Sequence, residues 1–572
     1  MQRGLTKGKL LGKGTSGRVY SAKSPNGTEY AVKRGIALRG SDFFVGAREL
    51  DMTTKSLHPC VIELRKVTEG NPFHNALMSP LMDEEVVFKN GRTVKVETPT
   101  KVYRDDTIHL VFSLAQGGNL YQFRKGRIFW THHDTRRIMA ELLVGLEYIH
   151  SMNILHRDIK PENILLKEEE IPDVFATMLG VSMPGPSSQS SPSTVLRVKL
   201  ADFGLAKPSC RFLPQTPKIT TCWYRAPEVS IGITNYDARI DIWSAGCIMY
   251  ELFTGDTFNG KKITENDTEL LQGIISSLPY IVTRQLVSNM DSRNQFRDIV
   301  YPMKPIGMGE FLRLYNRETQ KYCTPEEVTK KMESDPSLRD FTELLLNMLQ
   351  FDHNRRLTAS QALAHRYFDP IRPYIDFLRS LRPPAPMEFP PVELLFTIER
   401  KWMMEMANEY YRDRLKHSRW YTDRIFFQAI DICDRILIKG KPFINPKIIV
   451  TEDLGQLLTK TVCRLYFVAS LHFAFKYFAS LTALSLSELM PRELNTPANL
   501  GRVAKLEPIL VNQTLAYDIY HDTVYDVLCR NRPPQDGDAY SILRFIEAGH
   551  HNGKTPQEAY EFWNQNRKLY YP

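Results

Sequence analysis

The sequence predicts an α+β protein with a β-rich first lobe and a helical second lobe, followed by a separate all-α domain. Three observations lead to this prediction. Apolar and polar residues alternate around a glycine-rich turn at residues 11–20, which is typical of a β-hairpin. Apolar residues recur at helical spacing from Ile138 to Ile149. A proline-rich stretch at residues 380–391 then precedes a second helical pattern that starts near Val392.

The length of the chain determines the domain organisation that we expect. At 572 residues it exceeds what one hydrophobic core supports, so two or three cores are predicted. We assign residues 1–370 to the two-lobed domain, 371–391 to a proline-rich linker and 392–572 to the helical domain. Insertions at about residues 70–106 and 167–197 are longer than the lobes need, and we expect neither to enter the core.

Composition and charge exclude several classes of protein. An apolar fraction of 42% with 24% charged residues is ordinary for a folded soluble protein. The net charge of +9 is spread along the chain, so it does not favour nucleic-acid binding. The eight cysteines include no CxxC pair, which argues against zinc sites and a disulfide framework. We therefore expect an intracellular protein, cytoplasmic or nuclear.

Neither a signal peptide nor a membrane span is expected. The first ten residues lack the apolar segment of a signal peptide. The most apolar stretch, residues 465–486, is interrupted by His472 and Lys476. We interpret it as a buried helix rather than a membrane span.

The glycine-rich turn is a candidate phosphate-binding loop. Gly12, Gly14 and Gly17 precede Val19 with the spacing GxGxxGxV, and the missing Cβ atoms let phosphates approach the backbone. The same spacing also occurs in dinucleotide-binding folds, where a helix follows directly. Here the residues from Ser21 to Pro25 lack the sequence pattern of a helix, so a dinucleotide-binding fold is not favoured.

The next strand supplies a candidate partner for the phosphates. It ends in Tyr30-Ala31-Val32-Lys33, and Glu49 follows on a helical segment. A lysine at this position pairs with the α- and β-phosphates of ATP, and a glutamate on the following helix fixes it through an ion pair. We therefore predict a Lys33–Glu49 pair beside the glycine-rich loop.

The segment after the helix at 138–149 carries a set of catalytic candidates. It reads His156-Arg157-Asp158-Ile159-Lys160-Pro161-Glu162-Asn163. Asp158 can accept the proton of a substrate hydroxyl, and Lys160 can neutralise the γ-phosphate. Asn163 can hold Mg²⁺ together with Asp202 of the Asp202-Phe203-Gly204 motif. This set predicts phosphoryl transfer with ATP and Mg²⁺ as cofactors.

Together with Trp223-Tyr224-Arg225-Ala226-Pro227-Glu228, these motifs resemble the cyclin-dependent branch of the serine/threonine protein kinases. The resemblance covers about residues 4 to 370 and implies the bilobal protein kinase fold. Lysine at 160 is the serine/threonine pattern, and Arg225 implies substrates in which proline follows the acceptor. By the same resemblance, Glu228 pairs with Arg356, and Asp241 holds the catalytic loop. The implied ATP-binding residues are Leu11, Gly12, Gly14, Gly17, Val19, Ala31, Lys33, Phe112 as gatekeeper and Ala115 in the hinge.

The resemblance also implies a regulatory phosphorylation site. Thr216 lies seven residues before Trp223, where family members carry the activating phosphothreonine. Arg48, Arg157 and Lys207 are the expected partners of that phosphate. The alternative is an unmodified Thr-Pro turn, and the sequence does not distinguish self-phosphorylation from the action of a second kinase.

The C-terminal third resembles a cyclin box. The order of its helices carries this resemblance, and Lys476 and Glu507 match the pair with which cyclins hold the kinase helix. It implies a built-in activator that acts in cis, or in trans within a dimer, in cell-cycle or transcription-type signalling. Two alternatives stay open: a helical domain unrelated to cyclins, and a catalytically silent kinase scaffold held by an inhibitory helical domain. A fusion of this kind is compatible with a large DNA virus or a reduced eukaryote.

Overall fold

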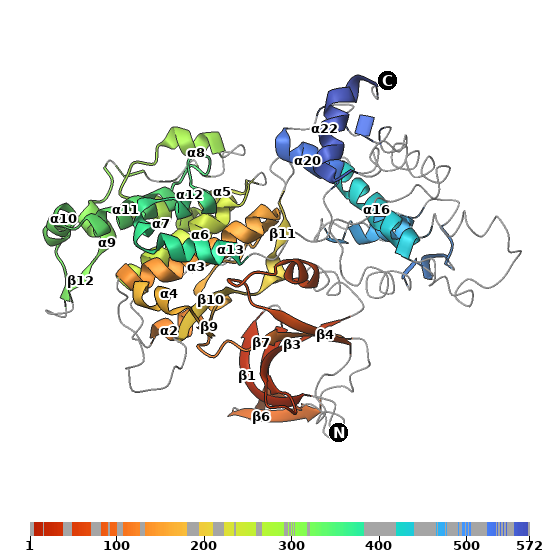
Figure 1. Cartoon of the computed structure of the whole chain (residues 1–572), viewed down its shortest axis with the longest axis horizontal. Coiled ribbons are helices and arrows are strands. Elements are labelled where there is room, and N and C mark those ends of the chain that lie inside the picture. The colour runs from red at the N-terminus through yellow and green to blue at the C-terminus, as the bar shows by residue number, and fades with distance from the viewer. Residues whose placement is uncertain are drawn as a thin grey trace, which may run out of the picture.

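The structure is a computed structural model of the whole chain. It describes residues 5–14, 17–37, 49–69, 82–89, 92–99, 107–125, 132–179, 194–209, 222–233, 236–258, 266–290, 304–316, 321–381 and 419–439, together with isolated positions between 296 and 302 and parts of 465–569. In the described part the chain forms a β-rich lobe, a helical lobe and a C-terminal helical region (Figure 1).

The first lobe is built on a five-stranded antiparallel sheet in the order β1-β2-β3-β7-β4. The strands are β1 (Thr6–Gly14), β2 (Gly17–Lys23), β3 (Glu29–Ala37), β4 (Leu64–Glu69) and β7 (Thr107–Ser113). Ala22, Val32 and Val111 form a small buried cluster in this sheet. Gly17 opens β2 at a φ of 129°, which a residue with a side chain rarely adopts, so glycine suits this end of the turn.

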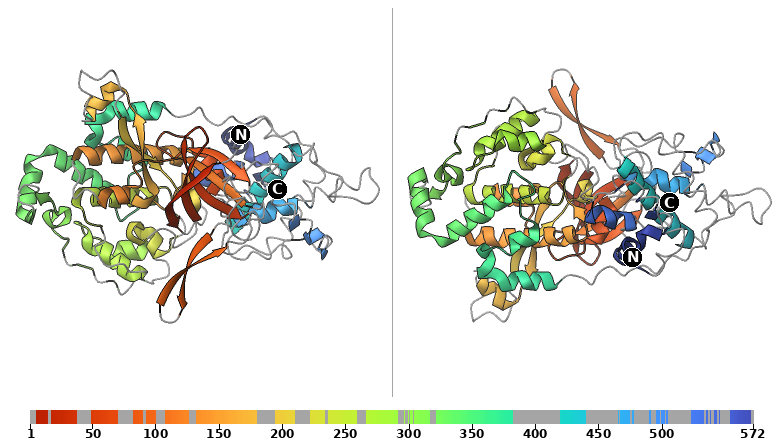
Figure 2. Two further views of the ribbon diagram at one scale, coloured as in Figure 1. Left: turned by 90° about the horizontal axis from the view of Figure 1, so that it is seen from below. Right: turned by 90° about the horizontal axis from the view of Figure 1, so that it is seen from above.

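The first insertion contains a separate hairpin. Strands β5 (Met82–Lys89) and β6 (Arg92–Pro99) pair only with each other and project away from the sheet (Figure 2). That the first insertion as a whole lies outside the core stays a prediction, because its other residues lie outside the described part of the chain.

The helical lobe is organised around two long helices, α3 (His132–Ser151) and α6 (Arg239–Thr254). Ile138, Leu142, Leu146 and Ile149 of α3 are fully buried, as their helical spacing predicts. Nearly every residue of α6 is buried, which places this helix at the centre of the lobe. The surrounding helices are α2 (Leu120–Lys125), α5 (Pro227–Ile231), α7 (Asp267–Ser277), α8 (Arg284–Met290), α9 (Met308–Leu312), α10 (Pro325–Ser334), α11 (Pro336–Met348), α12 (Ala359–Leu363) and α13 (Arg372–Ser380).

Short strands and 3₁₀ turns complete the described part of the two lobes. The strands are β8 (Ile154–Leu155), β9 (Ile164–Glu170), β10 (Thr194–Leu200), β11 (Lys207–Pro208), β12 (Tyr315–Asn316) and β13 (Lys321–Tyr322). The turns are η2 (Pro161–Asn163), η3 (Phe203–Leu205), η4 (Cys222–Tyr224) and η5 (Arg366–Ile371).

The second insertion differs from the sequence expectation, because its flanks enter the core. Strands β9 and β10 pair from Ile164 out to Glu170, and helix α4 (Asp173–Met178) follows. Ala176 is fully buried, and the Phe175 ring lies 4.8 Å from that of Phe377 in α13. The prediction was wrong here because the apolar residues beyond β9 find a helical surface to cover. The Pro/Ser-rich stretch of this insertion lies outside the described residues.

The predicted linker at 371–391 begins too early. Its first part forms α13, whose Tyr374, Ile375 and Leu378 are buried against the helical lobe. Arg379 of α13 also binds Glu147 of α3 through two hydrogen bonds of 2.7 and 2.8 Å. The chain therefore leaves the helical lobe only after α13, and the rest of the predicted linker lies outside the described residues.

The elements described in the C-terminal region are helices α16 (Arg419–Lys439), α20 (Val524–Asn531) and α22 (Pro556–Asn566) and the turn η9 (Arg567–Leu569). A buried polar network joins α16 to α20. Asp526 accepts hydrogen bonds from Arg424 Nε and Gln428 Nε2, both at 2.7 Å. Further hydrogen bonds between Asp526 and Thr523 cap α20, which explains why that helix begins there.

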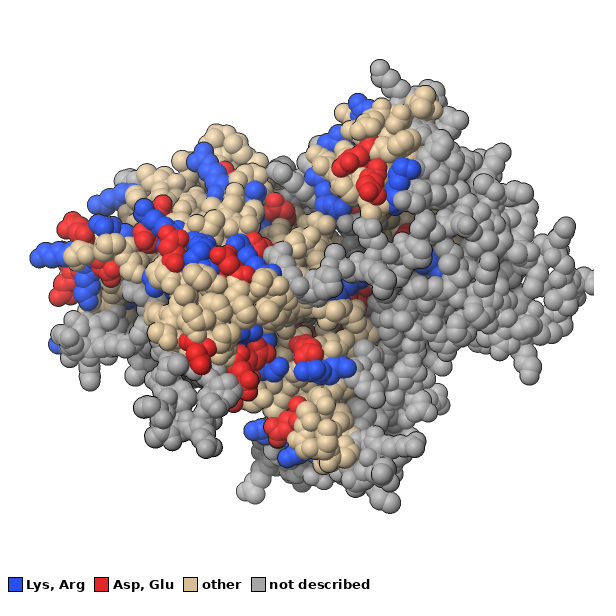
Figure 3. All heavy atoms as spheres, viewed as in Figure 1, with Lys and Arg blue, Asp and Glu red and all other residues tan. Residues whose placement is uncertain are grey.

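The surface and the length of the helices bear on two sequence predictions. Over the face of the helical lobe shown in Figure 3, Lys and Arg side chains are interspersed with Asp and Glu, with no extended patch of one sign among the coloured residues. This mixing gives no support to nucleic-acid binding on that face. Among the residues described, no helix combines the length and apolar character that crossing a bilayer requires.

Candidate active site

The sheet register brings the predicted nucleotide-binding residues onto one face. Val19 of β2 lies opposite both Gly12 and Lys33, and Ala31 lies opposite Phe112 of β7. Directly opposed residues point to the same face of an antiparallel sheet, as do residues two apart on one strand. These five residues therefore share one face, below which ATP is expected to lie.

The remaining predicted ATP-binding residues lie at the edges of this face. Leu11 and Gly14 are on β1, and Gly14 pairs with Gly17 across the hairpin turn. Ala115 follows β7, where its carbonyl accepts a hydrogen bond of 3.2 Å from Gly118 N and closes a turn. Each predicted residue is thus on or next to the sheet.

Lys33 joins the two lobes through two carboxylates. Its Nζ donates a hydrogen bond to Glu49 Oε1 and lies 3.0 Å from Asp202 Oδ1. Burial by itself would lower the pKa of Lys33, but Glu49 and Asp202 outweigh this effect and raise it above its usual value. Burial would likewise raise the pKa of Asp202, but Lys33 outweighs it and keeps that pKa low. Lys33 and Asp202 therefore face each other as a charged pair.

The catalytic loop places two predicted residues, Lys160 and Asn163, around the carboxylate of a third, Asp158. Asp158, 7% exposed, lies between β8 and η2. Its Oδ2 accepts hydrogen bonds from Lys160 Nζ at 2.7 Å and from Asn163 Nδ2 at 2.9 Å. The loop thus orients Asp158 and brings the cation of Lys160 beside it, which is the arrangement needed for proton acceptance near a transferred phosphate.

Asn163 and Asp202 fit the expected role of metal ligands. Asn163 Nδ2 donates to the carbonyl oxygen and the carboxylate of Asp158, both at 2.9 Å, so its amide oxygen is the atom left for a cation. Backbone pairing of Asn163 O with Ala201 N places the two ligand segments side by side. Carboxylate and amide oxygens suit Mg²⁺, which takes its other ligands from phosphates and water. No cluster of three or more His, Cys, Asp or Glu side chains able to hold a metal occurs among the described residues.

Asp241 of α6 supports the catalytic loop from below. Its two oxygens accept hydrogen bonds from the backbone N–H groups of His156 at 3.0 Å and Arg157 at 2.9 Å, and from His150 Nε2 at 2.9 Å. Arg157 has a φ of 66°, in the left-handed region that arginine seldom occupies. A buried carboxylate that accepts from both amides offsets this strain, as the sequence resemblance implies.

His156 is a structural member of this loop rather than an acid or base. Burial lowers its pKa more than Asp241 and Asp158 raise it, so the ring is neutral. Its Nε2 donates to the carbonyl oxygen of Ala201 at 3.0 Å, and Nδ1 then accepts from Asp158 N at 3.3 Å. The ring also packs edge-on against Phe203, which connects the Asp202 segment to the catalytic loop.

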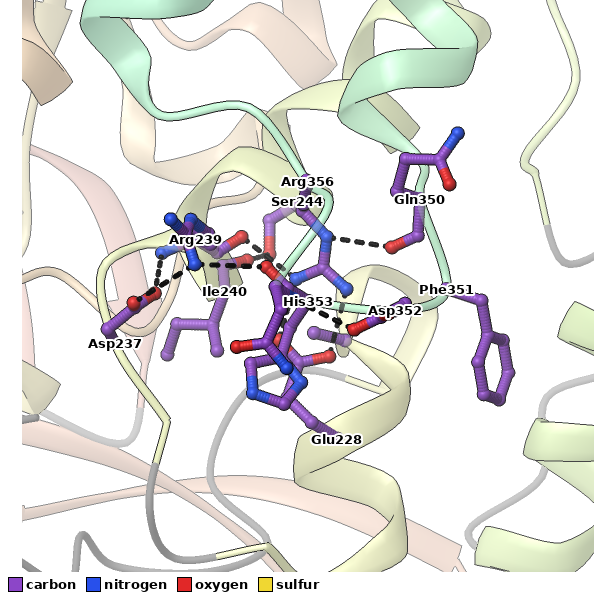
Figure 4. A network of polar contacts seen from close by, with 12 residues as sticks. Glu228, Asp237, Arg239, Ile240, Ser244, Gln350, Phe351, Asp352, His353 and Arg356 are labelled. Atoms are coloured by element: carbon purple, nitrogen blue, oxygen red, sulfur yellow. Dashed lines mark hydrogen bonds and ion pairs between the residues drawn. The ribbon is translucent and has the colours of Figure 1, made fainter. Parts of the chain in front are cut away.

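The predicted ion pair between Glu228 and Arg356 is formed in the helical lobe. Arg356 donates to both oxygens of Glu228, at 2.6 and 2.9 Å, and both side chains are fully buried. Figure 4 shows the guanidinium also directed at the carbonyl oxygens of Arg239 and Gln350. Arg356 thus fastens the end of the activation segment to α6 and to the loop before α12.

The predicted phosphothreonine site is only partly described. Thr216 and Arg48 lie outside the described residues. Arg157 is 2% exposed, and its guanidinium donates to Leu205 O at 2.7 Å and contacts Tyr236 Oη at 3.4 Å. Lys207 is buried in β11, which pairs with β8. The convergence of these three cations on Thr216 stays a prediction.

One contact with the C-terminal region was missed from the sequence. Tyr477 donates a hydrogen bond of 2.6 Å to Asp51 Oδ2, two residues after Glu49 on the helical segment 49–55. The contact residues predicted from sequence are its neighbour Lys476, which lies on the same helical stretch, and Glu507, which lies outside the described residues. Neither Asp51 nor Tyr477 belongs to a motif, so the sequence offered no signal for this contact.

Comparison of the sequence with known proteins identifies relatives of this chain. A family model for the protein kinase domain matches residues 5–368. Mitogen-activated protein kinase 13 of Bos taurus is 31% identical over 236 residues, which cover 41% of this chain and 50% of that protein. CTD kinase subunit alpha of Saccharomyces cerevisiae is 24% identical over 361 residues, which cover 63% of this chain and 53% of that protein. Cyclin-dependent kinase 1 of Encephalitozoon cuniculi is 26% identical over 374 residues, which cover 64% of this chain and 98% of that protein. The chain spans about half the length of the first two relatives.

Proposed function

This chain belongs to the protein kinase domain family, and we propose that it is an ATP-dependent serine/threonine protein kinase with a built-in, cyclin-like activator. The observation that carries the proposal is the position of Lys33, which contacts Glu49 and Asp202 at once while Asp158, Lys160 and Asn163 form a bonded group. All the polar groups needed for phosphoryl transfer are then held in place before substrate binds.

In the proposed reaction each residue of the site has its own role. Lys33 binds the α- and β-phosphates, and Asp158 orients the substrate hydroxyl and accepts its proton. The hydroxyl oxygen forms a new bond to the γ-phosphorus of ATP while the bond from that phosphorus to the β,γ-bridging oxygen breaks, and ADP is the leaving group. Lys160 neutralises charge on the γ-phosphoryl oxygens. Mg²⁺, held by Asn163 and Asp202, would supply further neutralisation of the phosphates.

We propose substrates in which proline follows the serine or threonine. Lys160 supports the serine/threonine part of this assignment, by resemblance. Arg225 supports the proline part, since it ends the activation segment and is fixed there by Asp267 of α7 at 3.0 Å.

We propose that the C-terminal helices activate the kinase, in cis or in trans within a dimer. Leu50 and Met52 belong to the same cluster of buried hydrophobic residues as Phe467, Phe473 and Tyr477. This packing coexists with an intact Lys33–Glu49 pair. An inhibitory domain would instead be expected to hold that pair apart. The alternative, a silent scaffold, is disfavoured for the same reason.

The experiment that tests catalysis and substrate class uses the full-length chain and two peptides that differ only in having Ser-Pro or Ser-Ala. We expect Mg²⁺-dependent phosphorylation of the Ser-Pro peptide to be at least about tenfold faster than that of the Ser-Ala peptide. Asp202→Asn should remove the activity, because it removes a metal ligand. Equal rates on both peptides would reject proline direction, and no Mg²⁺-dependent transfer at all would favour the silent scaffold.

A further inference from the structure

A buried hydrogen bond connects the C-terminal region to the helix that carries Glu49. The hydroxyl of Tyr477 donates to Asp51 Oδ2 at 2.6 Å, and neither residue is exposed to solvent. The two residues are 426 positions apart in the sequence. The bond therefore marks a place where the C-terminal region packs against the kinase domain.

Asp51 and Glu49 lie on different faces of the same helical segment. Residues two apart on an α-helix do not face each other, because each residue turns the helix by about 100°. Glu49 points toward Lys33 and the nucleotide site, whereas Asp51 points to Tyr477. The segment is thus bound on one face by the β-rich lobe and on another by the C-terminal region.

The second oxygen of Asp51 is bound by a residue that moves with it. Oδ1 pairs with Lys55 Nζ at 2.7 Å, one turn further along the same segment. Such a pair neutralises the carboxylate, but it cannot fix the segment relative to the rest of the protein. The Tyr477 bond comes from outside the segment, and a hydrogen bond to a buried carboxylate is among the stronger ones.

We propose that Tyr477 is a positioning residue that holds the Glu49 helix inward through Asp51, so that Glu49 stays paired with Lys33. The inference rests on the proposed function and adds to it the contact through which the activator acts. Without the hydroxyl, Asp51 becomes better solvated when the segment moves outward. That motion separates Glu49 from Lys33 and lowers the fraction of enzyme that is competent for transfer.

The test compares Tyr477→Phe with Tyr525→Phe in the full-length chain. Tyr525 is an equally buried tyrosine of α20, stacked on Phe427, and serves as the matched control. We expect Tyr477→Phe to lower kcat by about 5- to 30-fold, the range expected when one charge-assisted hydrogen bond biases the helix position. KM for ATP should change by less than about twofold, because the adenine and phosphate contacts on the strands are kept. Tyr525→Phe should leave both constants unchanged.

Two further measurements separate positioning from general destabilisation. In an Asp51→Ala background, which removes the acceptor, Tyr477→Phe should cost less than about threefold in kcat, because both changes act through the same bond. Amide hydrogen exchange of residues 49–55 should quicken by about tenfold in Tyr477→Phe, while that of α6 stays unchanged. This exchange readout does not depend on catalysis, so it decides the positioning role even if the full-length chain transfers no phosphate and the proposed function fails.

Any one of three results would overturn the inference. If Tyr477→Phe matches Tyr525→Phe in kcat and in exchange, the hydroxyl has no positioning role. If Tyr477→Phe costs as much in the Asp51→Ala background as in the native chain, Asp51 is not its partner. If Tyr477→Phe quickens exchange throughout the helical lobe, Tyr477 is a general packing residue.

Discussion

The role of Asp241 under the catalytic loop can be tested by replacing one oxygen. In Asp241→Asn the amide can keep its oxygen on the His156 N–H and His150, but its NH₂ group then faces the N–H of Arg157. One buried hydrogen bond is replaced by a contact between two donors, at a residue whose φ of 66° is already unfavourable. Loss of a charged hydrogen bond together with an unsatisfied buried donor costs about 2–4 kcal/mol.

This cost should be seen in stability and in turnover. We expect urea denaturation to give a free energy of unfolding of the helical lobe that is lower by that amount, and kcat to fall by about 10- to 100-fold because Asp158 follows Arg157 directly. Asp376→Asn is the matched control, since this α13 carboxylate has a side-chain exposure of 63% and should change stability by less than about 0.5 kcal/mol. Equal stability and turnover in Asp241→Asn and the control would refute the assignment.

The same carboxylate gives a pH dependence of known sign. Burial tends to raise the pKa of Asp241, but the hydrogen bond and charge of His150 and the other donors outweigh it and lower the pKa. A depressed folded-state pKa stabilises the fold fully above the unfolded value of about 4. The contribution of Asp241 is then lost as the pH falls from that value through the folded pKa. In Asp241→Asn the acid-unfolding curve should lose this component.

Further predictions concern the other ion pairs of the chain. Glu228→Ala should lower the free energy of unfolding by about 3–5 kcal/mol, because it leaves the fully buried Arg356 without its counter-charge. Glu343→Ala, at a half-exposed pair with Arg366, should cost about 0–1 kcal/mol, and a similar cost for both would contradict the burial argument. Lys33→Met should reduce kcat by at least about 100-fold in steady-state assays while the fold is kept, and a reduction below about tenfold would count against the nucleotide role. Asp526→Ala should destabilise the C-terminal helices by about 3–5 kcal/mol, seen as faster hydrogen exchange in α16, and unchanged exchange would mean that Arg424 finds another partner.

The residues of the candidate site were predictable because their motifs are short and their chemistry is local. Asp158, Lys160 and Asn163 lie close together in the sequence, so one turn of chain brings them into contact. Lys33 and Asp202 are 169 positions apart, and the sequence assigned each of them a role in phosphoryl transfer without predicting the contact between them.

Contacts between distant segments were harder to predict. Tyr477 and Asp51 carry no motif, and neither residue type by itself indicates a partner. Helix α13 was taken for linker because its residues border a proline-rich stretch. In the structure, the hydroxyl of the buried Tyr374 donates a hydrogen bond of 2.8 Å to Glu141 Oε1 of α3. Helix α4 was missed because insertions are expected at the surface, and only the tertiary surface of α3 and α13 gives its apolar residues a place to pack.

The measurement that tests the central claim most directly compares Mg²⁺-dependent phosphorylation of a Ser-Pro peptide by the full-length chain and by a chain ending at Pro386, with Asp202→Asn as the blank. Circular dichroism and a cooperative melt establish that the shorter chain is folded before rates are compared. If the C-terminal helices are a built-in activator, the folded shorter chain should lose at least about tenfold in kcat. Equal or higher activity in the shorter chain would contradict the account and make those helices an independent or inhibitory module.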